Sequence, residues 1–345
     1  MCEDLFYNAL NITTESGYKN LCEAFNEAGS WEKAWLNFAA KKKPLLDPET
    51  EWEKLRKLGV RLILYNEAEY PPQLGEIPFP PLGIYVLGTL PSDSAAVAVV
   101  GTRKATSDGK ELARRFAGEL SGAGLAIVSG LALGIDAAAH EGCLLANGKT
   151  VAVLACGLDN FYPRSNERLA EKILASGGAI ISEYPLGAEP LPYRFLERNR
   201  IVSGLARGVL VVEAPANSGS LATARFALDQ NREVFVVPGS VAHPNFTGSN
   251  QLIRKGAELV TSSGEILETL GIEQEPAGRQ AGTFGKAETE EEIKILNALE
   301  KFRRPAAVDE IVELTNLNAS DINMALTMLL MKNVVKETSD GYTVS

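Results

Sequence analysis

The stretch from residue 97 to residue 140 constrains the fold of this 345-residue chain more than any other. Two apolar runs, 97–100 and 125–128, are each cut short by a turn of small residues, and a helix-like segment, 107–120, lies between them. The order strand, turn, helix, strand, turn is how a doubly wound parallel sheet begins. We therefore expect an α/β fold whose ligands lie beyond the carboxyl ends of the strands.

Both turns have the composition of an anion site. The first is Gly101-Thr102-Arg103 and the second is Ser129-Gly130. Small residues let backbone N–H groups approach a phosphate, and a following helix adds a positive partial charge. Two adjacent phosphate sites are the favoured interpretation. The alternative is that Gly101 and Gly130 only make tight turns.

The alternation of strands and helices continues to about residue 270. Several of the later apolar runs are continuous, as in strands that are covered on both faces. They predict strands at 151–155, 179–182, 209–213, 234–237 and 258–260.

The segments on either side of this region have other patterns. Apolar residues recur at helical spacing over 1–60, which predicts a small helical module. The sheet domain is expected at 61–270, with a proline-rich N-terminal extension, and a Gly- and Pro-containing linker at 271–287. Three helix patterns and a hairpin follow at 288–345, the order of a winged helix.

The net charge of −10 is unusual for a nucleic-acid binder, but its distribution matters more. Residues 1–94 hold 9 Lys/Arg against 14 Asp/Glu, and residues 271–345 hold 8 against 13. Residues 95–270 hold 17 of each. The acid excess therefore lies in the flanks, and the sheet domain can still present a local basic surface to a polyanion.

Cysteine and histidine usage argues against metal binding and against a disulfide framework. The four cysteines, at positions 2, 22, 143 and 156, are scattered and form no CxxC pair. The two histidines, at positions 140 and 243, are isolated from each other. No run has the length of a membrane span, and the N-terminus lacks a signal-peptide pattern. We expect a cytoplasmic protein without a metal or cofactor.

The usual nucleotide-binding motifs are missing. The stretch 142–150 resembles a P-loop, but its spacing fails, and its GKT ends a helix instead of opening one. No GxGxxG fingerprint is present, and no Ser-His-Asp set can be assembled around either histidine. The sequence predicts no catalytic residue.

Eight short motifs follow one another over roughly residues 60–270. They are Val-Val-Gly101-Thr102-Arg103, Ser129-Gly130-Leu-Ala-Leu-Gly134-Ile-Asp136 with His140, Gly157-Leu-Asp159-Asn-Phe-Tyr162-Pro163-Arg164-Ser-Asn166, Ser182-Glu183-Tyr184-Pro185, Arg198-Asn199-Arg200-Ile-Val-Ser-Gly204-Leu, Ser218-Gly219-Ser220-Leu-Ala-Thr223-Ala, Val-Pro238-Gly239-Ser240 and Gly248-Ser-Asn250-Gln-Leu-Ile-Arg254. In sequence and order they resemble the DNA-processing protein A (DprA/Smf) family.

The resemblance implies a Rossmann-like, doubly wound, mostly parallel sheet with an N-terminal helical (SAM-like) module and a C-terminal winged-helix-like domain. It also implies a non-catalytic protein that binds single-stranded DNA, forms a homodimer through the Rossmann-like domain, protects incoming DNA and helps load the RecA recombinase during natural transformation. By position, Arg103 and Arg164 match the family's DNA-contacting residues, and both turns match its phosphate-binding turns.

A single strand needs cations for its phosphates and flat surfaces for its bases. We expect four arginines, at positions 103, 164, 198 and 200, to lie at or near strand-end loops of the sheet. Tyr162 is expected either to stack on bases or to pack in the core. For Arg198 and Arg200, an ion pair with Glu197 or Glu213 is an equal alternative to DNA contact. The predicted DNA-binding residues are Gly101, Thr102, Arg103, Ser129, Gly130, Tyr162, Arg164, Asn166, Arg198, Asn199, Arg200, Ser218, Gly219 and Ser220.

Two other functions are weighed. A phosphoribohydrolase shares this type of fold, but its PGGxGTxxE motif has no counterpart, because the stretch 218–225 has no Glu in register. A duplex-reading winged helix is disfavoured, because segment 320–332 contains no Arg and the first helix of its domain begins with glutamates at 288 and 290–292.

Overall fold

The computed structural model describes residues 3–272, apart from 15–16, 43–45 and 92–94, and residues 289–344, apart from 303, 316, 333 and 339–340. The chain forms two compact units, Met1–Ile272 and Glu273–Ser345. The linker predicted at 271–287 lies outside the described residues from position 273 onward.

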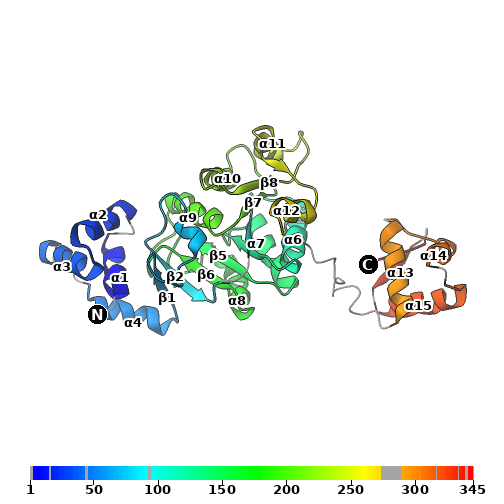
Figure 1. Cartoon of the computed structure of the whole chain (residues 1–345), viewed down its shortest axis with the longest axis horizontal. Helices are drawn as coiled ribbons and strands as arrows, with labels where there is room; N and C mark the ends of the chain where they lie inside the picture. The colour runs from blue at the N-terminus through cyan, green and yellow to red at the C-terminus, as the bar shows by residue number, and fades with distance from the viewer. Residues whose placement is uncertain are drawn as a thin grey trace. The chain divides into compact units, whose positions relative to one another are not determined.

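A nine-stranded sheet forms the centre of the first unit (Figure 1), in the order β1-β2-β6-β5-β4-β3-β7-β8-β9. β1 and β2 pair in antiparallel fashion with each other, β2 pairs antiparallel with β6, and the remaining pairs are parallel. The strands are β1 (Arg61–Leu64), β2 (Gly83–Gly88), β3 (Ala96–Val100), β4 (Ala126–Ser129), β5 (Thr150–Leu154), β6 (Ala179–Ser182), β7 (Gly208–Val211), β8 (Glu233–Val236) and β9 (Glu258–Leu259).

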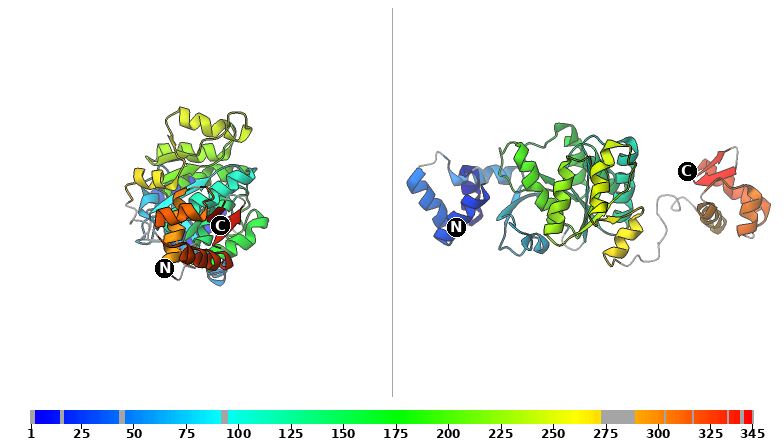
Figure 2. Two further views of the ribbon diagram at one scale, coloured as in Figure 1. Left: turned by 90° about the vertical axis from the view of Figure 1, so that its right-hand side faces the viewer. Right: turned by 90° about the horizontal axis from the view of Figure 1, so that it is seen from above.

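Helices cover both faces of this sheet (Figure 2), so the strands carry apolar side chains on both sides. This confirms the predicted doubly wound α/β class. The helices of this part are α5 (Pro72–Gly75), α6 (Ser107–Gly122), α7 (Ile135–Leu145), η1 (Arg164–Asn166), α8 (Glu167–Ala175), α9 (Pro192–Gly204), α10 (Gly219–Asp229), η2 (Pro244–Phe246), α11 (Thr247–Arg254) and α12 (Ser263–Thr269).

The first of the four N-terminal helices packs against the edge of the sheet, and the other three pack on it or on one another. Their side chains share one apolar core with β2, β5 and β6. Inside that core, the Tyr85 hydroxyl donates to Asn8 Oδ1 (2.9 Å) and accepts from Asn11 Nδ2 (3.2 Å). The helices are α1 (Glu3–Thr13), α2 (Tyr18–Ala28), α3 (Trp31–Lys42) and α4 (Pro48–Lys57).

The chain reverses direction across the sheet at β3. From β3 it adds β4, β5 and β6 on one side, and α9 then carries it back to β7 on the other side of β3. A ligand crevice opens at such a switch point, beyond the carboxyl ends of the strands. The loops after β3, β4 and β7 meet there, and these include both glycine turns.

The second unit has a small apolar core of its own. It consists of α13 (Glu290–Phe302), α14 (Val308–Thr315), α15 (Ala319–Met331) and a hairpin of β10 (Val335–Thr338) and β11 (Gly341–Val344). Three helices followed by a hairpin confirm the predicted winged-helix-like fold. Among the helices of the described ranges in both units, none combines the length and the apolar character that a membrane span requires.

His140 is a buried titratable group inside the sheet domain. It lies on α7, and its Nδ1 is 2.7 Å from Thr150 Oγ1, whose hydroxyl donates to the Ile127 carbonyl (2.7 Å). Its Nε2 has no partner within the described structure. Burial, helped by the nearby charge of Arg198, lowers the pKa of His140 to about 3.

The position of His140 makes the stability of this domain sensitive to acid. Below about pH 6.5 the imidazole of His140 is protonated in the unfolded chain. In the folded chain it stays neutral down to about pH 3. As the pH falls from about 6.5 to about 3, protonation of His140 in the unfolded chain therefore lowers the free energy of unfolding by up to about 1.4 kcal/mol for each pH unit.

We expect His140→Leu to remove this contribution, as measured by urea unfolding at several pH values between 7 and 5. Thr150→Val is the matched control, because it removes the same hydrogen bond but keeps the imidazole. It should lower stability at every pH and leave the pH slope intact. Equal slopes for His140→Leu and the unmodified protein would contradict the assignment.

Candidate nucleic-acid interface

A cavity of about 310 Å³ lies at the switch point of the sheet. Its walls come from the loops after β3, β4 and β7, from α9, and from the start of α10. Nine of the predicted DNA-binding residues line it, namely Gly101, Thr102, Arg103, Gly130, Arg198, Asn199, Ser218, Gly219 and Ser220. The fold thus brings together residues that are more than a hundred positions apart in the sequence.

Two amides and one hydroxyl of the glycine turns are already used inside the protein. The Thr102 N–H donates to the Glu213 carbonyl (2.7 Å), and the Gly130 N–H donates to Asp136 Oδ2 (3.1 Å). Ser129 is fully buried, and its hydroxyl donates to the Val99 carbonyl (2.7 Å). These three groups are therefore not free donors, and a phosphate would have to be bound by other groups of the two turns.

Close packing explains why both turns require glycine. A Cβ on Gly101 would lie 2.5 Å from Ile135 Cγ1, and a Cβ on Gly130 would lie 2.6 Å from Arg198 Nη2. The alternative that the glycines serve the turns themselves has this direct structural basis. Their part in binding a phosphate remains a prediction.

Arg198 forms the floor of the cavity and is almost completely buried. Its Nη1 donates to the carbonyl of Gly130 (2.8 Å) and to that of Val153, which joins the loop after β4 to strand β5. Burial lowers the pKa of this guanidinium, while the carboxylate of Asp136 acts in the opposite direction. Burial likewise raises the pKa of Asp136. The two charges compensate each other inside the protein.

Arg103 is the exposed cation of this site. Its guanidinium lies over the ring of Phe195 at 4.8 Å, and the ring of Tyr162 meets Phe195 edge-on at 5.6 Å. Tyr162 is 41% exposed, which favours base stacking over core packing. We call Arg103, Phe195 and Tyr162 the basic-aromatic ledge. It lies beside the cavity, because Arg103 and Phe195 also line the cavity.

Phe195 was missed by the sequence analysis. The signal that could have found it is helical spacing. Arg198 and Asn199 follow Phe195 by three and four positions, so the three residues share one face of α9. That face lines the cavity. The expected position of Arg198 and Arg200 at or near strand-end loops is wrong, because both lie within α9 (Pro192–Gly204).

Arg200 points away from the cavity. Two helical positions correspond to a rotation of about 200°, so Arg198 and Arg200 face opposite sides of α9. Arg200 is buried, pairs with Glu183 (Nη2 to Oε1, 2.7 Å) and donates to the Phe79 carbonyl (3.0 Å). The ion-pair alternative is confirmed for Arg200, but its partner is Glu183 instead of Glu197 or Glu213.

The remaining predicted residues divide into exposed and supporting groups. Arg164 is exposed at the start of η1. Asn166 is buried and donates to the carbonyls of Leu131 (2.8 Å) and Ala132 (3.2 Å), so it supports the loop after β4. That loop needs support, because Leu131 has a left-handed φ of 55°.

The start of α10 closes the cavity from the other side. The Ser218 side chain caps this helix at the Ser220 N–H (3.3 Å), and its hydroxyl lies 2.7 Å from that of Ser220. Asn199 Nδ2 donates to the Gly219 carbonyl (3.2 Å), which ties α9 to α10. The positive end of an eleven-residue helix therefore faces the cavity beside Arg103.

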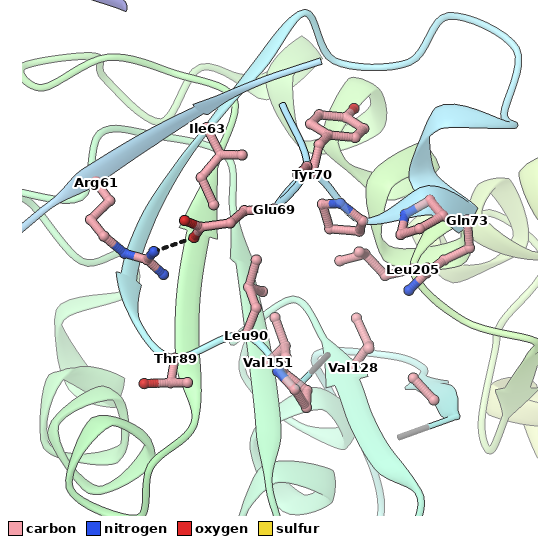
Figure 3. A pocket seen from close by; sticks show the side chains of 15 residues that line it. Arg61, Ile63, Glu69, Tyr70, Gln73, Thr89, Leu90, Val128, Val151 and Leu205 are labelled. Carbon is pink, nitrogen blue, oxygen red and sulfur yellow. Dashed lines mark hydrogen bonds and ion pairs between the residues drawn. The ribbon is translucent and has the colours of Figure 1, made fainter. Parts of the chain in front are cut away.

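A larger cavity, of about 550 Å³, lies at the opposite edge of the sheet (Figure 3). Its lining includes Ala96, which begins β3, and Leu205, which follows α9. Its one lining cation, Arg61, is paired with Glu69 at 2.5 Å, and most of the other lining side chains are apolar. No predicted DNA-binding residue lines this cavity, and it has no free charge for a phosphate.

The described residues also bear on metals and cysteines. They contain no group of three or more His, Cys, Asp or Glu side chains arranged to hold a metal ion. Cys22, Cys143 and Cys156 are free thiols. Burial raises the pKa of Cys156 to about 11 and that of Cys143 above its ordinary value. A raised thiol pKa disfavours the reactive thiolate.

Comparison with known protein families connects this chain to DNA recombination. A family model for DNA recombination-mediator protein A matches residues 61–271, which include the sheet and the whole switch-point cavity. A model for the DprA winged helix domain matches residues 280–341.

One relative and two solved structures agree with this result. Protein Smf of Synechocystis is 37% identical over 328 residues, which are 85% of this chain and 82% of that protein. The DNA processing protein A of Streptococcus pneumoniae has a TM-score of 0.61 at 37% identity, over 69% of this chain and 80% of that one.

The second structure is that of the DNA processing protein A of Helicobacter pylori, which was solved to explain how that protein binds single-stranded DNA. It matches with a TM-score of 0.55 at 32% identity. The match covers 61% of this chain and 95% of that one. A family model that spans the entire sheet, together with a relative matched over most of its own length, gives one answer. The chain belongs to the DNA recombination-mediator protein A family, also called DprA or Smf.

Proposed function

We propose that this protein binds single-stranded DNA along the basic-aromatic ledge and in the cavity beside it. One observation carries the proposal: an exposed arginine is stacked on an aromatic row at the switch point of the sheet, whereas Arg198 and Arg200 of α9 are buried and held by protein oxygens. Stacking surfaces beside a free cation suit a strand whose bases are open. In a duplex the base faces are stacked on each other and cannot reach such a ledge.

The proposed role is that of a recombination mediator that protects incoming DNA and helps load RecA during natural transformation. The RecA partner, the homodimer through the Rossmann-like domain and the cytoplasmic location rest on the family resemblance. The four-part division into a helical module, a sheet domain, a linker and a winged helix is likewise part of the proposal.

We infer that the cavity is not a phosphoribohydrolase active site. Of the described residues that line it, Asp136 is the one carboxylate, and it is buried against Arg198 and the Gly130 amide. Glu213, two residues after β7, is also buried. Its carboxylate accepts from the Thr106 N–H (3.0 Å) and from Asn245 Nδ2 (2.9 Å). Neither group is placed to act as a general base on a bound nucleotide.

Binding to single strands should depend clearly on salt and little on base sequence. The slope of log K against log salt is expected to be about −0.7 for each phosphate that the protein neutralises. Fluorescence anisotropy with a labelled oligonucleotide at several salt concentrations measures this slope. A duplex of the same sequence is the control, and tighter binding to the duplex would contradict the proposal.

Arg103→Ala should weaken single-strand binding without unfolding the protein, because the side chain is exposed. Loss of one charge-assisted contact costs about 1.5–3 kcal/mol, or roughly 10- to 150-fold in affinity. Arg115→Ala on α6 is the matched control, since Arg115 also lies over an aromatic ring but does not line the cavity. Unchanged binding by Arg103→Ala, with an unchanged melting curve, would remove Arg103 from the site.

The winged-helix unit is not expected to bind duplex DNA. Its described cations include two held in ion pairs, Arg304 with Glu310 (2.5 Å) and Lys332 with Glu292 (2.9 Å). Glu292 is buried, so it does not repel a phosphate as the sequence suggested; it neutralises Lys332. We therefore expect no duplex binding because the unit has an acid excess and two of its described cations are neutralised.

Deletion of residues 280–345 should leave single-strand affinity within a few-fold of the full chain. The fragment 286–345 should show no measurable binding to a labelled duplex at moderate salt. Saturable binding of the fragment at micromolar concentration, or a large loss of affinity in the deletion variant, would show that this unit contributes to the DNA site.

A further inference from the structure

The methionines of this chain gather on one helix. The sequence contains four, Met1 and three others at positions 324, 328 and 331, and these three all lie on α15. Met324 is 69% exposed, Met328 45% and Met331 76%. Every methionine other than the first residue therefore stands on the outer side of the third helix of the winged-helix unit.

Helical spacing makes these three side chains a continuous stripe. They are separated by four and then three positions, so each lies one turn above the previous one on the same face. The inner face of α15 is formed by other residues, Ile322, Ala325, Leu326 and Leu329, which are buried in the core of the unit. The methionine stripe (Met324, Met328 and Met331) is thus additional to what the fold needs.

An exposed apolar stripe of this kind is a feature of interaction surfaces. Methionine is usually a buried residue, and its flexible thioether adapts to partners of different shape. The surrounding charge limits what can dock. Residues 289–345 hold six Lys and Arg against ten Asp and Glu, and Asp321 is exposed one turn before Met324. An acidic surface disfavours DNA, an anionic membrane and a second copy of the same unit.

We propose that the methionine stripe of α15 is a docking site for a basic amphipathic helix of another protein. The apolar face of that helix would cover the three thioethers, and its flanking Lys or Arg residues would face the acid excess of the unit. Helices that lay an apolar face against a helical surface are a recurring mode of recognition. This proposal is independent of the DNA site, which lies in the other unit.

Methyl NMR on the full-length protein tests the proposal directly. Labelling with methyl-¹³C methionine yields at most four methyl signals, one for each methionine of the sequence. The probe is a synthetic amphipathic peptide of Leu and Lys, and its matched control has the same apolar pattern with Glu in place of Lys. We expect the Leu/Lys peptide to shift the signals of Met324, Met328 and Met331 saturably and to leave that of Met1 unchanged. The Leu/Glu peptide should shift none.

Two variants assign the effect to the stripe. Met324→Gln combined with Met328→Gln should weaken peptide binding at least tenfold, measured by the remaining signal of Met331 or by anisotropy of a labelled peptide. Leu145→Gln is the control. It removes an exposed apolar side chain in the other unit, at the end of α7, and should leave peptide binding unchanged. Because both changes are at exposed positions, folding is expected to persist, which the melting curve verifies.

Several outcomes would overturn the proposal. These are no shift with the Leu/Lys peptide, equal shifts with the Leu/Glu peptide, or unchanged binding by the double variant. Shifts of the stripe on dilution of the protein alone would indicate self-association. Shifts with phosphatidylglycerol vesicles or with a duplex oligonucleotide would assign the surface to a membrane or to DNA.

Discussion

The buried guanidinium of Arg198 holds the binding edge of the sheet in place. It reaches from α9 to the carbonyls of Gly130 and Val153, which belong to the ends of two neighbouring strands. A buried cation is tolerated only if it is compensated, and the carboxylate of Asp136 provides that compensation. Asp136 in turn accepts the Gly130 N–H. Removal of Arg198 would take this donor from the carbonyls of Gly130 and Val153 and would leave the buried Asp136 carboxylate without its compensating charge, so the loop after β4 depends on Arg198.

This internal network leaves a clear division of labour at the switch point. Arginines that stabilise the edge are buried and satisfied by protein oxygens, whereas Arg103 is exposed and rests on Phe195. A free cation on an aromatic support keeps its charge available and its side chain ordered before any ligand arrives. The fold thus prepares a stacking surface without having to rearrange the cavity behind it.

The winged-helix unit differs from the sheet domain, because two of its described cations are neutralised by ion pairs. Lys332 and Arg304 are both held by glutamates, and the third helix exposes three methionines but no Arg. A shared fold therefore does not bring a shared ligand, since the ligand is decided by the side chains that remain free on the surface.

The sequence by itself determined the class of sheet, the winged-helix order of the end unit and the edge at which the site lies. Apolar runs, glycine turns and chain order are local properties that can be read along the chain. Only the tertiary structure decided which arginine is free. Burial and pairing depend on residues distant in sequence, as in the contact of Arg198 with Gly130, 68 positions away, and the rotation of α9 that turns Arg200 toward Glu183. Phe195 joined the candidate site for the same reason, because only the folded chain brings Arg103, 92 positions away in the sequence, over its ring.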